Sequence, residues 1–437
     1  MANRCLVVDG TSPEGPDLGG MAGRIAGELE ARGAKVLRVT LRDEKLMHCR
    51  GCFGCWLETP GLCTSQDASS GLLRKLLESD EAVLVSEVTA GGYASTMKRF
   101  VDHWVQVALP FFVARRGELH HPLRYARFPR IVSVGVDPAP APERTRLFQT
   151  LAARNAINFP GPSWSAGVVA PDAPSETLGA ILQGSGPAAA ALGMPEGAPW
   201  RNGAEGPGRV LLLVGSPKVN KPSTSAVLGN RVLDQMASAG WEGQTLTLTP
   251  ALLGPQGREE LFEATRRAEL ILLAFPLYID ALPHLATRTL EVLRGQDLRG
   301  KALAAVINSG FPEARQNVVA AGICARFAAE AGLAWAGALA LGAGEALCGG
   351  EPILGRKGSR RPPVDHVVQG LDLAAAALAS GRQVPPAASA LLARTPIPFM
   401  PSWLWRRMFA VLGGRNWKRM AAKGVDLHAR PLDRVRT

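Results

Sequence analysis

Two stretches decide the fold: RCLVVDG at residues 4–10 and RVLLLVG at residues 209–215. Each is a short apolar run that ends in a glycine turn and precedes a stretch with helical periodicity. Later segments repeat in the same order, since PRIVSVGV from Pro129 corresponds to ALAAVINSG from Ala302. The sequence therefore predicts an internal duplication.

Strand-like and helix-like segments alternate in both copies, which is the pattern of a doubly wound sheet of parallel strands. We expect two such α/β domains, at residues 1–170 and 208–385. Residues 171–207 are rich in Pro, Gly and Ala and predict a linker. Residues 386–437 predict a basic tail that interleaves Trp, Phe and Met with Arg and Lys.

The first copy carries an insertion. Aligning Tyr93 with Tyr278 gives the first copy 20 extra residues, and HCRGCFGCWLETPGLCTSQD at residues 48–67 has that length. The stretch holds four of the seven cysteines, which are Cys49, Cys52, Cys55 and Cys63. We expect it to be an insertion that gives the first copy a function of its own, within a fold that both copies share.

The four cysteines are candidate metal ligands. Thiolates spaced by two residues can point into one loop, as in ferredoxin-like iron–sulfur sites. Structural zinc also takes four thiolates, usually as two C-x2-C pairs separated by a longer loop. A redox dithiol, or buried thiols that only pack, is the third interpretation. The residues alone leave these alternatives open.

The second copy carries polar residues where its first strand ends. The turn and helix start there contain Ser216, Lys218, Lys221, Ser223, Thr224 and Ser225. Hydroxyls, backbone N–H groups and the positive end of a helix suit a phosphate group, although Ser and Thr also serve as N-caps. The next two strands end at Pro276, Leu277 and Tyr278 and at Asn308, Ser309, Gly310 and Phe311. An aromatic ring and exposed amides there could hold a flat ring system.

These three loops resemble those of the flavodoxin-like, NAD(P)H-dependent FMN reductases, over roughly residues 208–345 and less completely over residues 3–170. The resemblance implies two tandem flavodoxin-like domains. It also implies FMN with its phosphate at Ser216, Lys218, Ser223, Thr224 and Ser225. The flavin ring is then expected near Pro276, Leu277 and Tyr278 and near Asn308, Ser309, Gly310 and Phe311.

The first copy is similar to the iron–sulfur flavoproteins of that family. The matching residues are Cys49, Cys52, Cys55 and Cys63, the following Asp67, and Lys98 and Asp102 further on. That likeness implies a four-iron four-sulfur cluster. The phosphate loop of this copy departs from the pattern, because Asp9, Glu14 and Asp17 oppose a phosphate by like charge.

The resemblance implies a flavin-dependent oxidoreductase that passes electrons from NAD(P)H through FMN to a quinone, a flavin or a similar small-molecule acceptor, or to a redox partner protein. An electron carrier without its own substrate is one alternative, and a structural or assembly protein with a zinc or thiol site is another. Because family members commonly pair as dimers, we expect the tandem chain to form a pseudo-dimer in which electrons leave FMN singly through the cluster. The sequence identifies no catalytic acid or base.

The composition, 437 residues with 46% apolar and 20% charged, indicates an ordered globular chain. We expect a cytoplasmic protein, because no secretory signal or long apolar run is evident. The net charge of +11 is concentrated late, at residues 356–361 and 406–423, without a nucleic-acid-binding module. We therefore expect solvated charge and no nucleic-acid partner. The basic tail could lie on a membrane surface, but packing of its aromatic residues on its own domain or on a partner is the favoured expectation.

Overall fold

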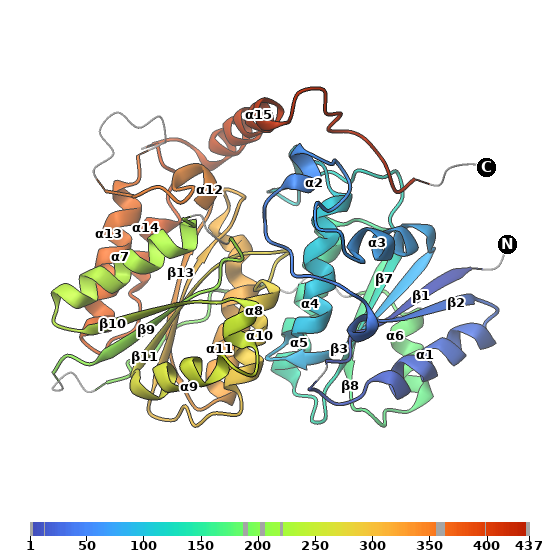
Figure 1. The fold of residues 1–437 in the computed structure, drawn as a ribbon, viewed down its shortest axis with the longest axis horizontal. Helices are drawn as coiled ribbons and strands as arrows, with labels where there is room; N and C mark the ends of the chain where they lie inside the picture. Colours follow the sequence, from blue (N-terminus) through green and yellow to red (C-terminus); the bar gives the residue numbers. More distant parts are fainter. Residues whose placement is uncertain are drawn as a thin grey trace. The chain divides into compact units, whose positions relative to one another are not determined.

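The structure is a computed structural model that describes residues 3–12, 14–186, 191–201, 206–218, 222–354, 363–397 and 399–433. The chain divides into two units (Figure 1). The first unit comprises Met1–Ala191 and Ala410–Thr437, and the second comprises Leu192–Phe409. Lys221 and the basic cluster at residues 356–361 lie outside the described residues.

The first unit is built on five parallel strands in the order β2-β1-β3-β7-β8. Their bounds are β1 Arg4–Asp9, β2 Lys35–Thr40, β3 Glu81–Thr89, β7 Arg130–Val136 and β8 Trp164–Val169. The short β4, Gly92–Tyr93, pairs antiparallel with the end of β3. Strands β1, β3 and β7 are almost fully buried, as expected when helices cover both faces of a parallel sheet.

The second unit repeats this sheet with the order β10-β9-β11-β12-β13. Its strands are β9 Arg209–Val214, β10 Glu242–Thr247, β11 Leu270–Pro276, β12 Ala302–Asn308 and β13 Ala334–Leu341, all parallel. Both sheets therefore have the strand order 2-1-3-4-5 that defines the flavodoxin-like doubly wound fold. The predicted fold class is confirmed.

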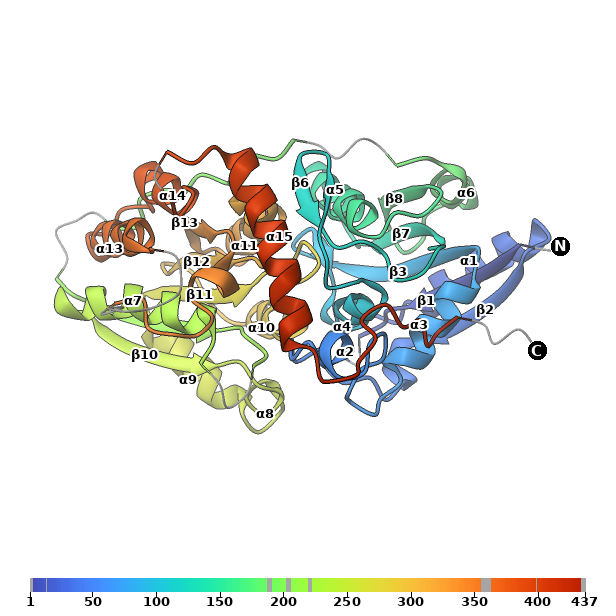
Figure 2. The same cartoon turned by 90° about the horizontal axis from the view of Figure 1, so that it is seen from above.

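Helices cover the two sheets (Figures 1 and 2). The first unit has α1 Gly19–Ala31, η1 Leu41–Asp43, α2 Gly54–Leu57, α3 Ser69–Glu78, α4 Ser95–Asp102, η2 His103–Val107, α5 Pro142–Asn158 and α6 Ser175–Gln183. The second has α7 Thr224–Ser238, α8 Pro250–Leu253, α9 Arg258–Arg267, α10 His284–Leu293, η3 Ala314–Asn317, α11 Val318–Glu330, α12 Gly344–Leu347, α13 Asp365–Ala379 and α14 Pro386–Leu392. The last helix is α15, Ser402–Met420. None of the described helices is long and apolar enough to cross a membrane.

Strand register aligns the two copies residue by residue. Residues 5–9 of β1 pair with residues 81–85 of β3, and residues 210–214 of β9 pair with residues 270–274 of β11. Counting onward, the left-handed turn residues Ala90 and Gly91 coincide with Ile279 and Asp280, which also have positive φ. Thr89 therefore takes the position of Tyr278. The alignment of Tyr93 with Tyr278 is wrong by four residues, because it followed the shared aromatic residue and not the turn.

The extra residues of the first copy lie between β2 and β3. That connection is 40 residues long, at residues 41–80, whereas the equivalent connection in the second unit is 22 residues long, at residues 248–269. The excess of 18 residues is close to the expected 20. The four-cysteine stretch lies within this connection, as the sequence predicts.

The predicted linker and tail both pack on the units. Helix α6 adds Leu178 and Leu182 to the core of the first unit. Trp335 on β13 donates its indole N–H to the Pro195 carbonyl, and its own carbonyl accepts from the Ala198 N–H. Helix α14 packs on α13 and β13. Residues 171–207 and 386–437 are thus each divided between the two units, because their apolar side chains cover parts of both cores.

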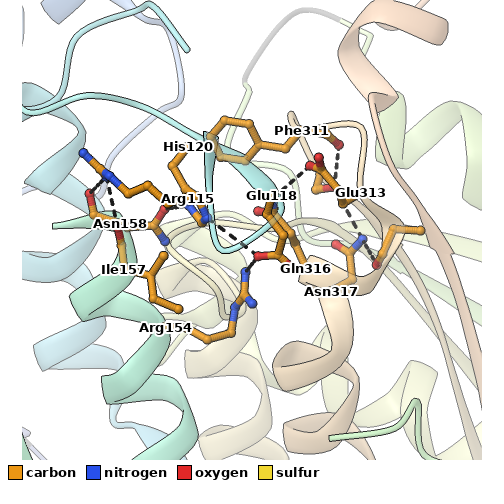
Figure 3. A network of polar contacts seen from close by, with 12 residues as sticks. Arg115, Glu118, His120, Arg154, Ile157, Asn158, Phe311, Glu313, Gln316 and Asn317 are labelled. Carbon is orange, nitrogen blue, oxygen red and sulfur yellow. Dashed lines mark hydrogen bonds and ion pairs between the residues drawn. The ribbon is translucent and has the colours of Figure 1, made fainter. Parts of the chain in front are cut away.

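A two-stranded hairpin of the first unit is not part of its main sheet. It consists of β5, Val113–Arg115, and β6, Glu118–His120, and polar contacts attach it to α5 (Figure 3). Arg154 on α5 lies 3.0 Å from the Glu118 carboxylate, and His120 Nδ1 lies 2.7 Å from Asn158 Oδ1. These buried contacts fix the hairpin beside the helix.

Candidate functional site

The carboxyl ends of β9, β11 and β12 meet at one edge of the second sheet, and Asn308 joins the loops there. Its side-chain Oδ1 accepts a hydrogen bond from the Ser225 hydroxyl at 2.8 Å, in the first turn of α7. Its carbonyl accepts from the N–H of Leu277, at 2.7 Å, just after β11. The structure therefore brings together the three loops that the sequence singled out.

The first turn of α7 contains an unpartnered hydroxyl. Ser223 is the N-cap, and its Oγ accepts from the Ala226 N–H at 3.1 Å. Thr224, the next residue, is 3% exposed, and its Oγ1 has no hydrogen-bond partner among the described residues. A buried hydroxyl without a partner costs roughly 1–3 kcal/mol, so the site favours a ligand that accepts or donates there. The first N–H groups of a helix and its dipole favour an anion at the same place.

A cation lies in the loop before α7. Lys218 Nζ is 3.1 Å from Glu345 Oε2 on α12, and Lys218 is partly exposed. Ser216, two residues earlier, is buried, and its hydroxyl accepts weakly from the Lys218 N–H at 3.5 Å. The predicted loop residues Ser216, Lys218, Ser223, Thr224 and Ser225 therefore surround the start of one helix.

A strained turn follows β11. Tyr278 and Ala281 exchange backbone hydrogen bonds of 2.9 and 3.1 Å around Ile279 and Asp280, whose φ angles are 45° and 59°. Two successive positive φ values define a type I′ turn, which favours Asn and Gly and disfavours a β-branched residue such as Ile279. Backbone strain of this kind is common at ligand sites. Pro276, Leu277 and Tyr278 are half-buried on this turn.

The loop after β12 is fixed by polar contacts. Ser309 is buried, and its hydroxyl donates to the Phe311 carbonyl at 3.1 Å and accepts from Asn317 Nδ2 at 3.4 Å. Gly310 is exposed, and Phe311 is half-buried. The Phe311 carbonyl also accepts from the N–H of Ala343, whose φ is 56°. The loop therefore presents a fixed backbone at the sheet edge.

Sequence analysis missed three residues that shape this edge. Asn317 holds Ser309, and Ala343 binds Phe311 from the loop after β13. Gly344 packs so closely that a Cβ there would lie 2.9 Å from Asn308 Cβ and 3.2 Å from Thr224 Cγ2. The only sequence signal for Gly344 was its place after a predicted strand. Many turns have a glycine there, so the signal does not indicate a functional site.

The equivalent loop of the first unit is closed by its own carboxylate. Asp9, which takes the position of Val214, accepts from the Thr11 N–H at 2.9 Å and the Thr11 hydroxyl at 2.6 Å. The Thr11 hydroxyl in turn accepts from the Leu18 N–H at 3.0 Å. Both residues are buried. The hydroxyl that could bind a phosphate is therefore already satisfied, next to a negative charge.

The four cysteines lie in one loop of the first unit, with backbone N–H groups directed at three of the sulfur atoms. The N–H of Gly54 is 3.5 Å from Cys52 Sγ, and the N–H of Ser65 is 3.4 Å from Cys63 Sγ. The backbone of Gly51 likewise forms a hydrogen bond with the sulfur atom of Cys49. Each donor follows its cysteine by two residues. Such N–H···S contacts stabilise thiolates and tune sulfur-ligated iron.

The four sulfur atoms are near enough to repel one another as thiolates. Burial raises the pKa of Cys55 well above its usual value, and the charges of Cys49, Cys63 and Cys52 raise it further. Burial and the Asp102 carboxylate raise the pKa of Cys49 to about 12. Burial also raises the pKa of Cys63, but hydrogen bonds from His103 and Ser65 outweigh this effect. The pKa of Cys63 therefore lies below the usual value of a thiol. A bound cation would relieve this mutual repulsion.

No group of three or more His, Cys, Asp or Glu side chains within the described ranges is placed to hold a metal ion. Cys55 is buried, Cys49 and Cys63 are half-buried, and Cys52 is exposed. The metal site therefore stays a prediction.

Charged residues named with the cysteines by the family resemblance lie close to them. Lys98 and Asp102 form a buried ion pair on α4. Asp67 accepts from the N–H groups of Met47 and Ser69, at 2.9 and 3.0 Å, and its Oδ2 lies 3.9 Å from His103 Nε2. Asp67 and His103 therefore tie the start and the end of the cysteine stretch together.

Aromatic residues and the end of the chain pack beside the cysteine loop. Trp417 packs against Phe53 and Trp56, with ring centroids 5.1 Å apart in both pairs. The buried Arg124 donates to the carbonyls of Leu427 and Ala429, both at 2.8 Å. The expected packing of tail aromatics on the protein is therefore observed for Trp417.

Comparison with solved structures gives partial matches to flavin-related proteins. An NADH:FMN oxidoreductase in its apo form is 18% identical, with a TM-score of 0.33, over 44% of this chain and 96% of that one. An FMN-dependent NADH-azoreductase from Bacillus anthracis is 10% identical, with a TM-score of 0.29, over 39% and 99%. A flavodoxin variant from Pseudomonas aeruginosa is 15% identical, with a TM-score of 0.25, over 31% and 85%.

No protein-family model matches the chain, and no curated protein matches its sequence. The assignment of the fold therefore depends on the strand order and the parallel pairing within each sheet.

Proposed function

We propose that the second unit binds FMN at the carboxyl edge of its sheet, and that the chain is a flavin-dependent oxidoreductase that takes electrons from NAD(P)H. The observation that carries this proposal is the buried Thr224 hydroxyl, which has no partner among the described residues and lies in the first turn of α7. A phosphate there would accept from this hydroxyl and from the first N–H groups of the helix.

The remaining residues have distinct roles in this proposal. Ser223 fixes the start of α7, and Ser225 fixes Asn308, so both position the site. Lys218 supplies a positive charge beside the phosphate, and its ion pair with Glu345 holds it at the loop. The turn at Tyr278 and the loop from Ser309 to Phe311 would flank the flavin ring. Bound FMN would supply hydride acceptance and the conversion of two-electron into one-electron transfer.

We propose in addition that Cys49, Cys52, Cys55 and Cys63 hold a four-iron four-sulfur cluster. The backbone N–H groups directed at the sulfur atoms of Cys49, Cys52 and Cys63 support an anionic sulfur site. Electrons would leave FMN singly through this cluster to a quinone, flavin or redox partner protein.

Replacing Thr224 by Val tests the FMN site. The variant removes one hydrogen bond to a charged group, so we expect FMN affinity to fall roughly 10- to 100-fold, as measured by quenching of flavin fluorescence. NAD(P)H oxidation at limiting FMN should fall with it. The apo protein should not lose stability, because the hydroxyl has no partner to lose.

Thr265→Val is the matched control. The Thr265 hydroxyl is also buried and unpartnered within the described part of the chain, but it lies on α9, away from the carboxyl edge of the sheet. Its loss should leave FMN affinity unchanged. Absence of FMN binding by the unaltered protein, or equal losses in both variants, would overturn the proposal. Tight FMN binding without NAD(P)H oxidation would make the chain an electron carrier.

A further inference from the structure

Helix α15 exposes large apolar side chains as well as burying two aromatic residues. Trp405 and Phe409, four residues apart, are buried. Trp403, Leu404, Val411 and Leu412 are exposed by 59%, 38%, 48% and 52%. Residues at 403, 404, 407, 411, 415 and 418 follow the three- and four-residue spacing of one helix face. The helix therefore carries apolar side chains on its buried face and also on its exposed face.

The apolar exposure is concentrated in this part of the chain. Of the 11 large apolar residues that are exposed within the described ranges, seven lie between residues 397 and 420. Phe399, just before the helix, is fully exposed. Soluble surfaces rarely gather large apolar side chains in one place unless the patch contacts something.

The charge of the same segment has one sign. Residues 395–425 contain no Asp or Glu, and they contain six basic residues, Arg406, Arg407, Arg415, Lys418, Arg419 and Lys423. Arg407, Arg415, Lys418 and Arg419 are exposed. The face thus combines a Trp and aliphatic side chains at its start with a cluster of cations towards its end.

We propose that this face of α15 docks the protein on an anionic membrane surface. Apolar side chains of an interfacial helix enter the boundary between headgroups and acyl chains, while Arg and Lys reach lipid phosphates. Each Arg or Lys near an anionic leaflet strengthens binding to the membrane. Since residues 395–425 contain no Asp or Glu, no carboxylate of this segment repels the lipid phosphates. A second copy of the chain fits this face less well, because two such faces would bring like charges together. The inference is independent of flavin or metal binding.

Vesicle co-sedimentation of the full chain tests the proposal. We expect binding to vesicles of phosphatidylcholine mixed with phosphatidylglycerol, and little binding to phosphatidylcholine alone. Salt at about 0.5 M should release the protein, because it screens the lipid charge. The triple variant Arg407→Gln, Arg415→Gln and Arg419→Gln should lower partitioning on the order of a hundredfold, about fivefold per charge.

An apolar variant and matched controls complete the experiment. Trp403→Ser with Val411→Ser should weaken binding to the same anionic vesicles at least tenfold, roughly in proportion to the apolar area removed. Leu37→Ser and Arg127→Gln change an exposed leucine and an exposed arginine elsewhere in the first unit, and they should have no effect. Because all substituted side chains are exposed, every variant should keep the thermal unfolding midpoint of the unaltered protein.

The outcomes separate the possible occupants of this face. Binding to neither kind of vesicle, equal binding to both, or binding that survives both multiple variants would overturn the proposal. Self-association lost in the Trp403→Ser and Val411→Ser variant, without vesicle binding, would assign the face to a second copy and would also overturn it.

Discussion

One side chain distinguishes the first loops of the two copies. Asp9 and Val214 take the same position at the end of the first strand, and each is followed by a glycine and a hydroxyl residue. The carboxylate of Asp9 accepts hydrogen bonds from the N–H and the hydroxyl of Thr11. Both donors of Thr11 in the first unit therefore have a partner without a ligand. In the second unit Val214 offers no acceptor, and a hydroxyl at Thr224 stays unpaired among the described residues. A phosphate site is therefore expected in the second unit only.

Burial at a single histidine predicts acid sensitivity of the first unit. His121 is half-buried against Trp56, and its Nδ1–H donates to the Phe111 carbonyl at 2.8 Å. Burial lowers the pKa of His121 from 6.5 to about 4. Between these values the unfolded chain binds more protons than the folded chain, so stability is lost as the pH falls from 6.5 towards 4. The loss should reach at most about 3 kcal/mol.

Urea unfolding at pH 7 and pH 4.5 measures this contribution. The difference between the two pH values should shrink in His121→Asn, which keeps an N–H donor but does not titrate. His428→Asn is the control, because His428 is exposed and should leave the acid sensitivity unchanged. An equal pH dependence in all three proteins would show that His121 does not sense acid.

At the scale of elements, strand order and loop position were predictable, but turn geometry was not. Alternating apolar strands and helical segments indicated the parallel sheets, and parallel strands bring their carboxyl-end loops to one edge. The contacts of Asn308 with Ser225 and Leu277 agree with that expectation. The sequence did not indicate the left-handed turn at Ile279 and Asp280, because Ile is rare at positive φ. Matching by aromatic residue therefore misplaced the tyrosines.

The contact of α12 with the end of β12 gives a prediction at this scale. A Cβ at Gly344 would lie 2.9 Å from Asn308 Cβ and 3.2 Å from Thr224 Cγ2, too close for either to stay in place. We expect Gly344→Ala to destabilise the second unit by about 1–3 kcal/mol and to weaken FMN binding severalfold by displacing Asn308. Thermal unfolding and FMN titration measure both effects.

Gly295→Ala is the matched control for this prediction, because nothing lies within 4 Å of the Cβ position there. It should change neither stability nor FMN affinity appreciably. If Gly344→Ala destabilised the protein but bound FMN normally, Asn308 would not belong to the flavin site.

At the scale of the whole chain, two copies of one scaffold carry different loops at the carboxyl ends of their first strands, and only the first copy carries the four-cysteine insertion. The insertion between β2 and β3 was predictable from the difference in length between the two copies, and the polar loop of the second copy from its position after a strand. The division of the tail between the two units could not be predicted, because it depends on contacts between residues some 300 positions apart in the sequence. Arg124 binds the carbonyls of Leu427 and Ala429, and Tyr125 accepts from the N–H of Leu432. Residues that end the chain therefore complete the first unit.

Because each proposed site is built within one unit, the two cofactors should be separable by mutation. We expect the anaerobically purified chain to carry one FMN and about four iron atoms. Cys55→Ser should lose the iron and keep FMN, whereas Thr224→Val should be purified with less FMN and should keep the iron. Cys324→Ser, which changes a buried cysteine outside the insertion, should keep both. Flavin absorbance and elemental analysis on the same samples give the stoichiometry.

The separable variants also test electron transfer between the sites. NAD(P)H should reduce the iron of the unaltered chain, as detected by electron paramagnetic resonance, and should reduce the iron of Thr224→Val only in proportion to the FMN that stays bound, because hydride must first be converted to single electrons by a flavin. Chemical reduction with dithionite should still reduce the iron in that variant, which shows that the cluster is intact. Iron reduced by NAD(P)H without FMN would contradict the relay, and zinc in place of iron would assign the cysteines a structural role.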